Sequence, residues 1–257
     1  LNDISLEIGQ GQFVGIIGHT GSGKSTLIQH LNGLMKATSG DILYDGQSIY
    51  AEGYDMRKLR SQVGLVFQYP EHQLFEVDVI SDVCFGPKNQ GLSEEESEKN
   101  AREALELVGF PEKYYKQSPF ELSGGQKRRV AIAGVMAMQP ECIIFDEPTA
   151  MLDPVGRNEV IDTLHSLNEE KGITIILITH HMNEAIKADR VFVMDKGKLV
   201  MQGSPKEVFS HVEKLKSLGL EVPQVTELAY MLKKSGLNIE DGILTVEELM
   251  MQINENR

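Results

Sequence analysis

The residues from Gly18 to Ser25 have the types and spacing of a loop that binds nucleotide phosphates, G-x-x-x-x-G-K-[ST]. Glycines let the backbone of such a loop fold so that its N–H groups surround phosphate oxygens. Lys24 would then reach the terminal phosphates, and the Ser25 hydroxyl would ligate magnesium. The apolar segment before the loop and the helical residues after it supply the strand and the helix that this motif requires. We therefore predict a nucleotide site that begins at this loop.

A pair of acidic residues, Asp146 and Glu147, follows a later apolar segment and precedes Pro148. An aspartate in this place can hold magnesium through water, and a glutamate can polarise the water that attacks a phosphate. An acidic pair at a strand end is also typical of a turn or helix cap, so the catalytic interpretation depends on the loop at Gly18. His180 ends the next expected strand and is a candidate contact for the γ-phosphate or its water, although a single histidine there is often only solvated.

A second segment suited to anions reads Leu122-Ser123-Gly124-Gly125-Gln126 and precedes an expected helix. A serine N-cap followed by two glycines leaves N–H donors and the positive end of a helix available, without any lysine. One chain then carries two half-sites for phosphate. A protein with a complete phosphate loop needs the second half-site only if it serves the nucleotide of another molecule.

Several segments are expected to form the framework around these motifs. Apolar runs without alternation predict strands covered on both faces, at residues 13–17, 63–67, 142–145, 174–178 and 190–194. The alternation of Ile4, Leu6 and Ile8 with polar residues predicts one more, half-exposed strand. Residues from about 80 to 140 are expected to be helical, with a capping box at Ser93 and Glu96.

The last part of the chain is again expected to be helical and to form a small unit. Ser204 with Glu207, and Thr245 with Glu248, have the spacing of capping boxes. A proline at position 205 suits the first turn of the first of these helices.

Composition restricts the possible classes of protein. The formal net charge of −13 repels the phosphate backbone of nucleic acids, so binding them would need a concentrated basic surface. The dense basic cluster at 127–129 is too short to form such a surface. No apolar run approaches the ~20 residues that cross a bilayer, so any membrane role would be played from its surface. Cys84 and Cys142 lack the spacing of a disulfide framework or a zinc site, which fits a reducing cytosol. The chain has no initial methionine, and we expect the numbering to begin inside a longer chain.

In order and at similar spacing, these motifs resemble the Walker A, Q-loop, signature, Walker B, D-loop and switch-histidine elements of ABC ATPases. The residues that carry the likeness are Gly18 to Thr26, Gln68, Leu122 to Gln126, Asp146 to Thr149, Leu152 to Pro154 and His180. The likeness covers residues 1 to about 205. In that family two subunits bind head to tail, and each ATP lies between the Walker A loop of one subunit and the signature helix of the other.

The resemblance implies a fold and a set of site residues. The fold would be α/β, a P-loop NTPase (RecA-like) core with a mostly parallel sheet and an antiparallel β portion. Residues 1–205 would form the nucleotide-binding domain, with a helical subdomain at about 72–138, and residues 206–257 a C-terminal helical extension. The implied ATP-binding residues are Gly18, His19, Thr20, Gly21, Ser22, Gly23, Lys24, Ser25, Thr26 and Gln68. The residues that would bind the ATP of the partner are Ser123, Gly124, Gly125 and Gln126. The implied catalytic residues are Glu147, His180 and Lys24. The implied Mg²⁺ ligands are Ser25, Gln68 and Asp146.

A narrower resemblance is to the ATPase subunits of energy-coupling factor (ECF) transporters, closest to the second of their two paralogues. Residues 68–75, 85–89, 18–21 and 126–135 carry it. It implies ATP hydrolysis that energises an importer of vitamins or metal micronutrients such as cobalt. The implied partners are a second ABC ATPase subunit, identical or paralogous, a transmembrane coupling protein and a substrate-binding membrane protein, with no nucleic acid. The subunit would lie on the cytoplasmic face of the cell membrane, and its C-terminal extension would help it dimerise.

Two features depart from the family pattern. The aromatic residue that stacks on adenine is expected upstream of Leu1, and Met151 stands in the D-loop where a small residue is commoner. We expect Met151 to be tolerated because methionine packs adaptably.

The alternative functions that stay open are an ABC ATPase of another transporter class, a soluble P-loop ATPase or kinase, and a scaffold that does not hydrolyse ATP. An ABC protein of DNA repair is disfavoured because no long coiled coil fits between Ser25 and Leu122, and a translation-type relative would carry two cassettes.

Overall fold

The computed structural model of this protein describes residues 1–255, and the chain falls into two compact units. Unit 1 comprises residues 1–8, 12–24 and 177 onward, and unit 2 comprises residues 9–11 and 25–176. The boundary passes through helix α1 (Lys24–Leu31) and strand β6 (Thr174–Ile178). Each unit is described by itself.

Unit 1 holds a sheet in the order β6-β1-β7-β8, to which β6 contributes its last residues. Its elements are β1 (Phe13–Ile17), α7 (Met182–Ala185), β7 (Arg190–Asp195), β8 (Lys198–Gly203), α8 (Pro205–Ser210), α9 (Val212–Ser217), α10 (Gln224–Lys234) and α11 (Val246–Glu255). β1 and β7 are parallel, with Ile17 opposite Val193, whereas β7 and β8 are antiparallel. All five residues of β1 are buried, as the apolar run predicts for a strand covered on both faces.

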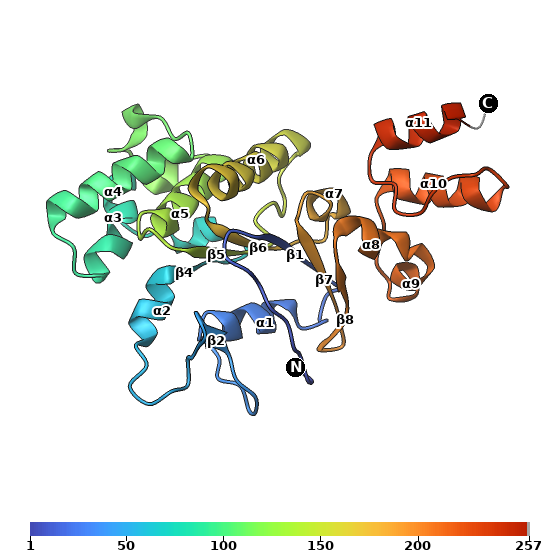
Figure 1. The fold of residues 1–257 in the computed structure, drawn as a ribbon. Helices are drawn as coiled ribbons and strands as arrows, with labels where there is room; N and C mark the ends of the chain where they lie inside the picture. Colours follow the sequence, from blue (N-terminus) through green and yellow to red (C-terminus); the bar gives the residue numbers. More distant parts are fainter. Residues whose placement is uncertain (256–257) are drawn as a thin grey trace. The chain divides into compact units, whose positions relative to one another are not determined.

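Unit 2 contains the remaining strands and most of the helices. Its elements are β2 (Leu43–Tyr44), β3 (Gln47–Ser48), α2 (Met56–Gln62), β4 (Val63–Val66), α3 (Val79–Asn89), α4 (Glu94–Leu107), α5 (Gly124–Met136), β5 (Cys142–Asp146) and α6 (Pro154–Lys171), with 3₁₀ turns at Pro70–Gln73, Glu112–Tyr114 and Pro119–Glu121. β4 and β5 are parallel, and the start of β6 follows β5 in the sheet. Helices α3, α4 and α5 pack against one another as a helical group, drawn in green in Figure 1. The prediction of a mostly parallel sheet with an antiparallel part and added helices is confirmed.

Capping residues explain where several helices begin. The Ser93 side chain accepts from the Glu96 N–H and Glu96 accepts in return from the Ser93 N–H, which is the predicted capping box of α4. The same reciprocal pair forms at the start of α8, between Ser204 and Glu207. Because such caps satisfy N–H groups that a helix start leaves unpaired, they fix these boundaries locally.

The C-terminal helices of unit 1 have an apolar centre of their own. Ala229, Ile239, Ile243 and Leu249 are buried together there. The Thr245 hydroxyl accepts from the Glu248 N–H at the start of α11, as the sequence predicts. The division into domains at residue 205 stays a prediction. Within residues 1–255, no helix combines the length and apolarity that crossing a bilayer would require.

The predicted strand at residues 4–8 is wrong. Ile4, Leu6 and Ile8 are half-buried and Ser5 and Glu7 are exposed, so the expected alternation is present. No strand is assigned to this segment, however. Alternation reports which side of a chain is covered, whereas a strand also needs ladder hydrogen bonds to a neighbour.

A close approach between β4 and α5 in unit 2 gives a first testable prediction. A Cβ added at Gly64 would lie 2.3 Å from Val135 Cγ1. Gly64→Ala should therefore force the packing of α5 to shift and lower the free energy of unfolding by about 1–3 kcal/mol. Denaturant unfolding of the purified chain measures this, and an unchanged midpoint would show that the contact relaxes at no cost.

Candidate nucleotide site

The phosphate loop of unit 1 runs from the end of β1 to the start of α1. Gly18 has no room for a side chain, because a Cβ there would lie 2.4 Å from the Met194 carbonyl oxygen. Gly21 and Gly23 have φ angles of 80° and 103°, in the region that favours glycine. These glycines are therefore required by the backbone path of the loop.

Two polar groups in this loop fit a bound phosphate. Lys24 is only 5% exposed, and its Nζ donates to the carbonyl oxygens of Gly18 at 2.7 Å and His19 at 3.1 Å. These contacts hold the ammonium inside the loop, where phosphate oxygens could be its acceptors. Ser22 Oγ is buried and has no hydrogen-bond partner among residues 1–255, which is an uncommon and costly state for a hydroxyl. The residues present therefore fit a triphosphate.

The hydroxyl residues that follow belong to α1 in unit 2. Ser25 is exposed and Thr26 is half-buried, both in the first turn of that helix. The start of a helix carries unpaired N–H groups and a partial positive charge, both of which favour phosphate oxygens. A serine hydroxyl is an oxygen ligand of the kind that Mg²⁺ prefers.

The acidic residues of unit 2 lie at the end of β5. Asp146 is buried, at 9% exposure, and Glu147 is half-buried. Gln68 lies after the parallel strand β4, and its Nε2 donates to Glu147 Oε2 at 3.1 Å. Because parallel strands end at the same edge of a sheet, unit 2 brings Gln68, Asp146 and Glu147 to one place, as their positions in the sequence suggest.

The backbone at Glu147 adopts a conformation that the sequence does not predict. Its φ is 51°, in the left-handed region that costs a non-glycine residue of order 1–3 kcal/mol. Such conformations persist where the surroundings impose them, and they are concentrated at functional sites. The strained backbone at Glu147 thus favours a functional interpretation of this carboxylate over a simple turn.

The signature segment of unit 2 forms the beginning of α5. Ser123 is the N-cap, accepting from the Gln126 N–H, and the Gln126 side chain accepts from the Ser123 N–H in return. Ser123 and Gly124 are exposed, and Gly125 and Gln126 are half-buried. Apart from the adjoining backbone, no atom of the described residues lies within 4 Å of where a Cβ would stand at Gly124 or Gly125. This helix tip therefore faces open space.

Sequence reasoning missed the role of Arg128. A basic cluster at 127–129 suggests a solvated helix face, but Arg128 is only 2% exposed and its Nη1 donates to the Ala150 carbonyl at 3.2 Å. Arg128 therefore links α5 to the residue that precedes the predicted D-loop within unit 2. Met151, next to Ala150, has a φ of 60° and is 89% exposed, so its side chain is scarcely covered by the described residues. The left-handed backbone explains why a glycine would suit that position better.

The predicted switch histidine of unit 1, His180, is exposed and follows β6. Hydrogen bonds of the adjacent residues, Thr179 and His181, hold the backbone on either side of His180. The buried Thr179 hydroxyl donates to Glu184 Oε2 at 2.5 Å and accepts from the His181 N–H at 2.9 Å. These two bonds fix the path of the chain through His180.

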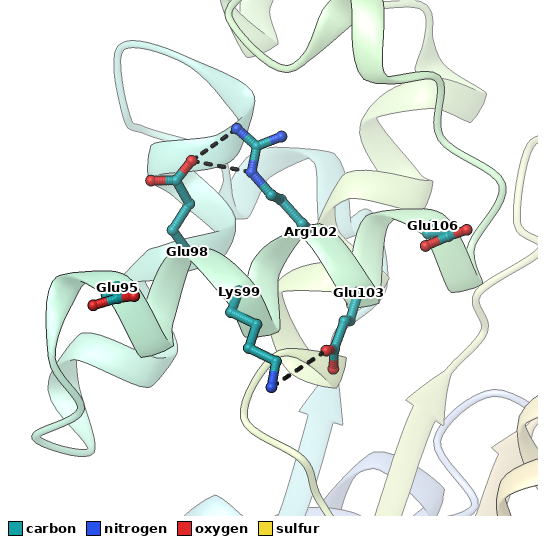
Figure 2. A pocket seen from close by; sticks show the side chains of 6 residues that line it. All are labelled: Glu95, Glu98, Lys99, Arg102, Glu103 and Glu106. Atoms are coloured by element: carbon teal, nitrogen blue, oxygen red, sulfur yellow. Dashed lines mark hydrogen bonds and ion pairs between the residues drawn. The ribbon is translucent and has the colours of Figure 1, made fainter.

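A surface hollow along α4 lies apart from all of these residues in the sequence (Figure 2). It is lined by Glu95, Glu98, Lys99, Arg102, Glu103 and Glu106. Arg102 pairs with Glu98 at 2.7 Å, and Lys99 lies 4.0 Å from Glu103, both one helical turn apart. Exposed pairs of this kind contribute a few tenths of a kcal/mol to helix stability and need no ligand to explain them.

The two cysteines are free, and burial disfavours the thiolate form of both. Burial raises the pKa of the Cys84 thiol, and burial raises that of Cys142 to about 12. A thiol with such a pKa stays protonated near neutral pH, and only the thiolate is a good nucleophile or metal ligand.

Comparison with known proteins adds to this geometry. Residues 1–150 match the family model described as ABC transporter. An energy-coupling factor transporter ATP-binding protein EcfA2 from Clostridium tetani is 53% identical over 255 residues, covering 98% of this chain and 88% of that protein. An EcfA1 protein from Caldanaerobacter subterraneus subsp. tengcongensis is 54% identical over 250 residues, covering 97% of this chain and 90% of that protein. Both paralogue names thus occur among relatives of similar identity.

Solved structures show a similar fold. The cbiO1 protein from Clostridium perfringens, described as part of the ABC transporter complex cbiONQ, has a TM-score of 0.76 at 41% identity, with 90% of each chain covered. A dimeric, post-hydrolysis ATP-binding cassette, MJ0796 bound to ADP and Pi, has a TM-score of 0.71 at 32% identity, covering 79% of this chain and 90% of that one.

Proposed function

Given that this chain belongs to the ABC transporter family and is an ATP-hydrolysing subunit that energises an energy-coupling factor transporter, we propose that two cassettes close around ATP. The loop at residues 18–24 of one cassette would face residues 123–126 of the other. The main support for this arrangement is the exposed tip of α5, where two glycines border open space. An anion site without a cation of its own suits a phosphate that another subunit already holds.

The roles of the catalytic residues follow from their chemistry. Lys24 and the N–H groups at the start of α5 would stabilise the charge that develops on the transferred phosphoryl group. Glu147 would orient and polarise the attacking water, and His180 would contact the γ-phosphate or that water. Mg²⁺, held by Ser25, Gln68 and Asp146, would neutralise charge on the phosphate oxygens.

Binding alone can drive the movement of the two cassettes. If ATP binds the closed pair more tightly than the open one, it shifts the population toward closure, and hydrolysis reverses the shift. Closure would be passed to a transmembrane coupling protein through the region beside Gln68. A substrate-binding membrane protein would choose the solute, for which we propose the class of vitamins and metal micronutrients. The ATPase would then act as a peripheral subunit on the cytoplasmic face of the membrane.

Sedimentation of the purified chain tests the proposed closure. With ATP and without Mg²⁺, so that hydrolysis is blocked, we expect a dimer, and without nucleotide a monomer. A matched run with the Lys24→Ala variant should stay monomeric, because that variant lacks the cation that reaches the terminal phosphates. A chain that hydrolyses ATP at full rate as a monomer would contradict the proposal and favour a soluble P-loop enzyme.

Purification of the tagged chain from its native membranes tests the proposed partners. We expect one integral membrane protein to co-purify in constant ratio, together with a second ATPase subunit if the dimer is mixed. Recovery only from the soluble fraction, with no membrane protein attached, would argue against a peripheral transporter subunit.

A further inference from the structure

The phosphate loop of unit 1 lies against the turn between β7 and β8. The Gly197 N–H donates to the Ser22 carbonyl at 2.8 Å. A Cβ at Gly23 would lie 3.3 Å from Gly197 Cα, and one at Gly18 would meet the Met194 carbonyl. The shape of the loop therefore depends on residues 194–197, which belong to none of the nucleotide motifs.

The His19 side chain joins the loop to this turn. Its Nε2 lies 2.8 Å from Asp195 Oδ1, and its Nδ1 lies 2.8 Å from the Thr20 carbonyl oxygen. A carbonyl oxygen and a carboxylate oxygen can only accept hydrogen bonds, and neutral imidazole has a single N–H to donate. Both contacts are hydrogen bonds at once only if the ring is doubly protonated.

We propose that Asp195 is a positioning residue that holds His19 as an imidazolium, so that the phosphate loop presents a second cation in addition to Lys24. The inference rests on the proposed use of this loop for the phosphates of ATP. Asp195 itself need not touch the nucleotide, because it acts through the charge and orientation of the His19 ring. The sequence motif leaves position 19 open, so it gives no reason to expect this role.

The direction of the expected pH dependence follows from the surroundings of the ring. The hydrogen bond to the Thr20 carbonyl, and then the bond to Asp195, raise the pKa of His19 above 6.5, whereas burial and the charge of Lys24 oppose this. A raised pKa means that the cation is present at lower pH and is lost as the pH rises through that pKa. The affinity for ATP should therefore fall over the same interval.

The size of the effect is limited by solvent. The His19 side chain is 36% exposed, so water and salt screen its charge. Losing one partly exposed cation should weaken ATP binding by about two- to fivefold. The terminal phosphate of the nucleotide also titrates near pH 6, and comparison with His19→Gln, which keeps a donor but cannot ionise, removes that contribution.

The first measurement needs no nucleotide. Histidine side-chain NMR of the purified full chain, with the His19 signal assigned from its absence in His19→Gln, gives the pKa of the ring. We expect a value above 6.5 in the wild type and a clear fall in Asp195→Asn. Asp241→Asn is the matched control, since it removes an exposed carboxylate that pairs with Lys233, and should leave the His19 titration unchanged. A His19 ring that titrates at or below the ordinary histidine value in the wild type overturns the inference.

The second measurement is the dissociation constant of Mg²⁺-free ATP between pH 6 and 8.5. We expect the affinity of the wild type for ATP to fall with rising pH, relative to that of His19→Gln. In Asp195→Asn the fall should occur at lower pH. Asp195→Glu should recover part of the wild-type dependence of affinity on pH. A merely structural role for Asp195 would weaken binding equally at every pH and overturns the inference. Wild type that binds no ATP overturns the proposed function and this inference together, whereas pH-independent binding relative to His19→Gln overturns the inference alone.

Discussion

Replacing Glu147 with glutamine should lower the rate of ATP hydrolysis by roughly 10²- to 10⁴-fold, which is the usual contribution of a general base. The change preserves the size of the side chain and an oxygen that can accept from Gln68 Nε2, which lies 3.1 Å from the carboxylate. It removes the negative charge that would polarise the attacking water in the proposed mechanism. ATP binding and dimer closure should therefore survive while turnover is lost. Phosphate release and sedimentation with Mg-ATP measure the two properties separately.

Glu141→Gln is a matched control for this prediction. Glu141 immediately precedes β5, which Glu147 follows, and its carboxylate accepts from the Tyr44 hydroxyl at 2.6 Å and from Gln62 Nε2 at 3.2 Å. It is exposed and has no proposed part in hydrolysis, so turnover should stay close to the wild type. Near-normal hydrolysis in Glu147→Gln would show that another group activates the water.

Local patterns predicted much of the structure. The capping boxes at Ser93 and Ser204, the serine N-cap of the signature helix and the apolar strands β1 and β6 occur where the sequence places them. Each depends on residues close together in the chain, such as a serine and a glutamate three positions apart. Such patterns can be read without knowing the rest of the fold.

Features that depend on distant residues were not predictable in this way. The bond from Arg128 to the Ala150 carbonyl and the contact of His19 with Asp195 join positions that only the folded chain brings together. The left-handed backbone at Glu147 is likewise imposed by its surroundings, because glutamate has no preference for that conformation. At residues 4–8 the alternating pattern was correct about burial but wrong about a strand.

The distribution of charge is consistent with the proposal that two chains share the phosphate contacts. The chain carries a net charge of −13, so most of its surface repels nucleotides. Within unit 1 the buried Lys24 is held inside the loop by carbonyl oxygens. Within unit 2 the start of α5 offers backbone donors on an exposed surface. In the proposed arrangement, the loop with Lys24 would bind phosphate strongly, and the start of α5 would contact a phosphate that the other chain already holds.

Gly125→Ala should lower the rate of ATP hydrolysis without lowering the stability of the chain. A Cβ at Gly125 meets no atom of the described residues within 4 Å outside the adjoining backbone, and its φ is not positive. In the isolated chain, alanine should therefore leave stability unchanged or raise it by up to about 1 kcal/mol, because it is a better helix former than glycine. Hydrolysis should nevertheless fall by roughly 10²- to 10³-fold, because the new methyl group would occupy space that the partner's nucleotide needs and displace the N–H donors from the phosphate.

Gly134→Ala is the matched control, since it makes the same change later in α5, where a Cβ also meets no atom of residues 1–255 within 4 Å outside the adjoining backbone. It should bring the same gain in helix stability with little loss of turnover. Denaturant unfolding and phosphate release on both variants give the comparison. If both variants hydrolyse ATP at the wild-type rate, the open space at the tip of α5 is not filled by nucleotide, and the site would have to be complete within one chain. A loss confined to Gly125→Ala, in a protein at least as stable as the wild type, assigns that space to a group that this chain does not supply.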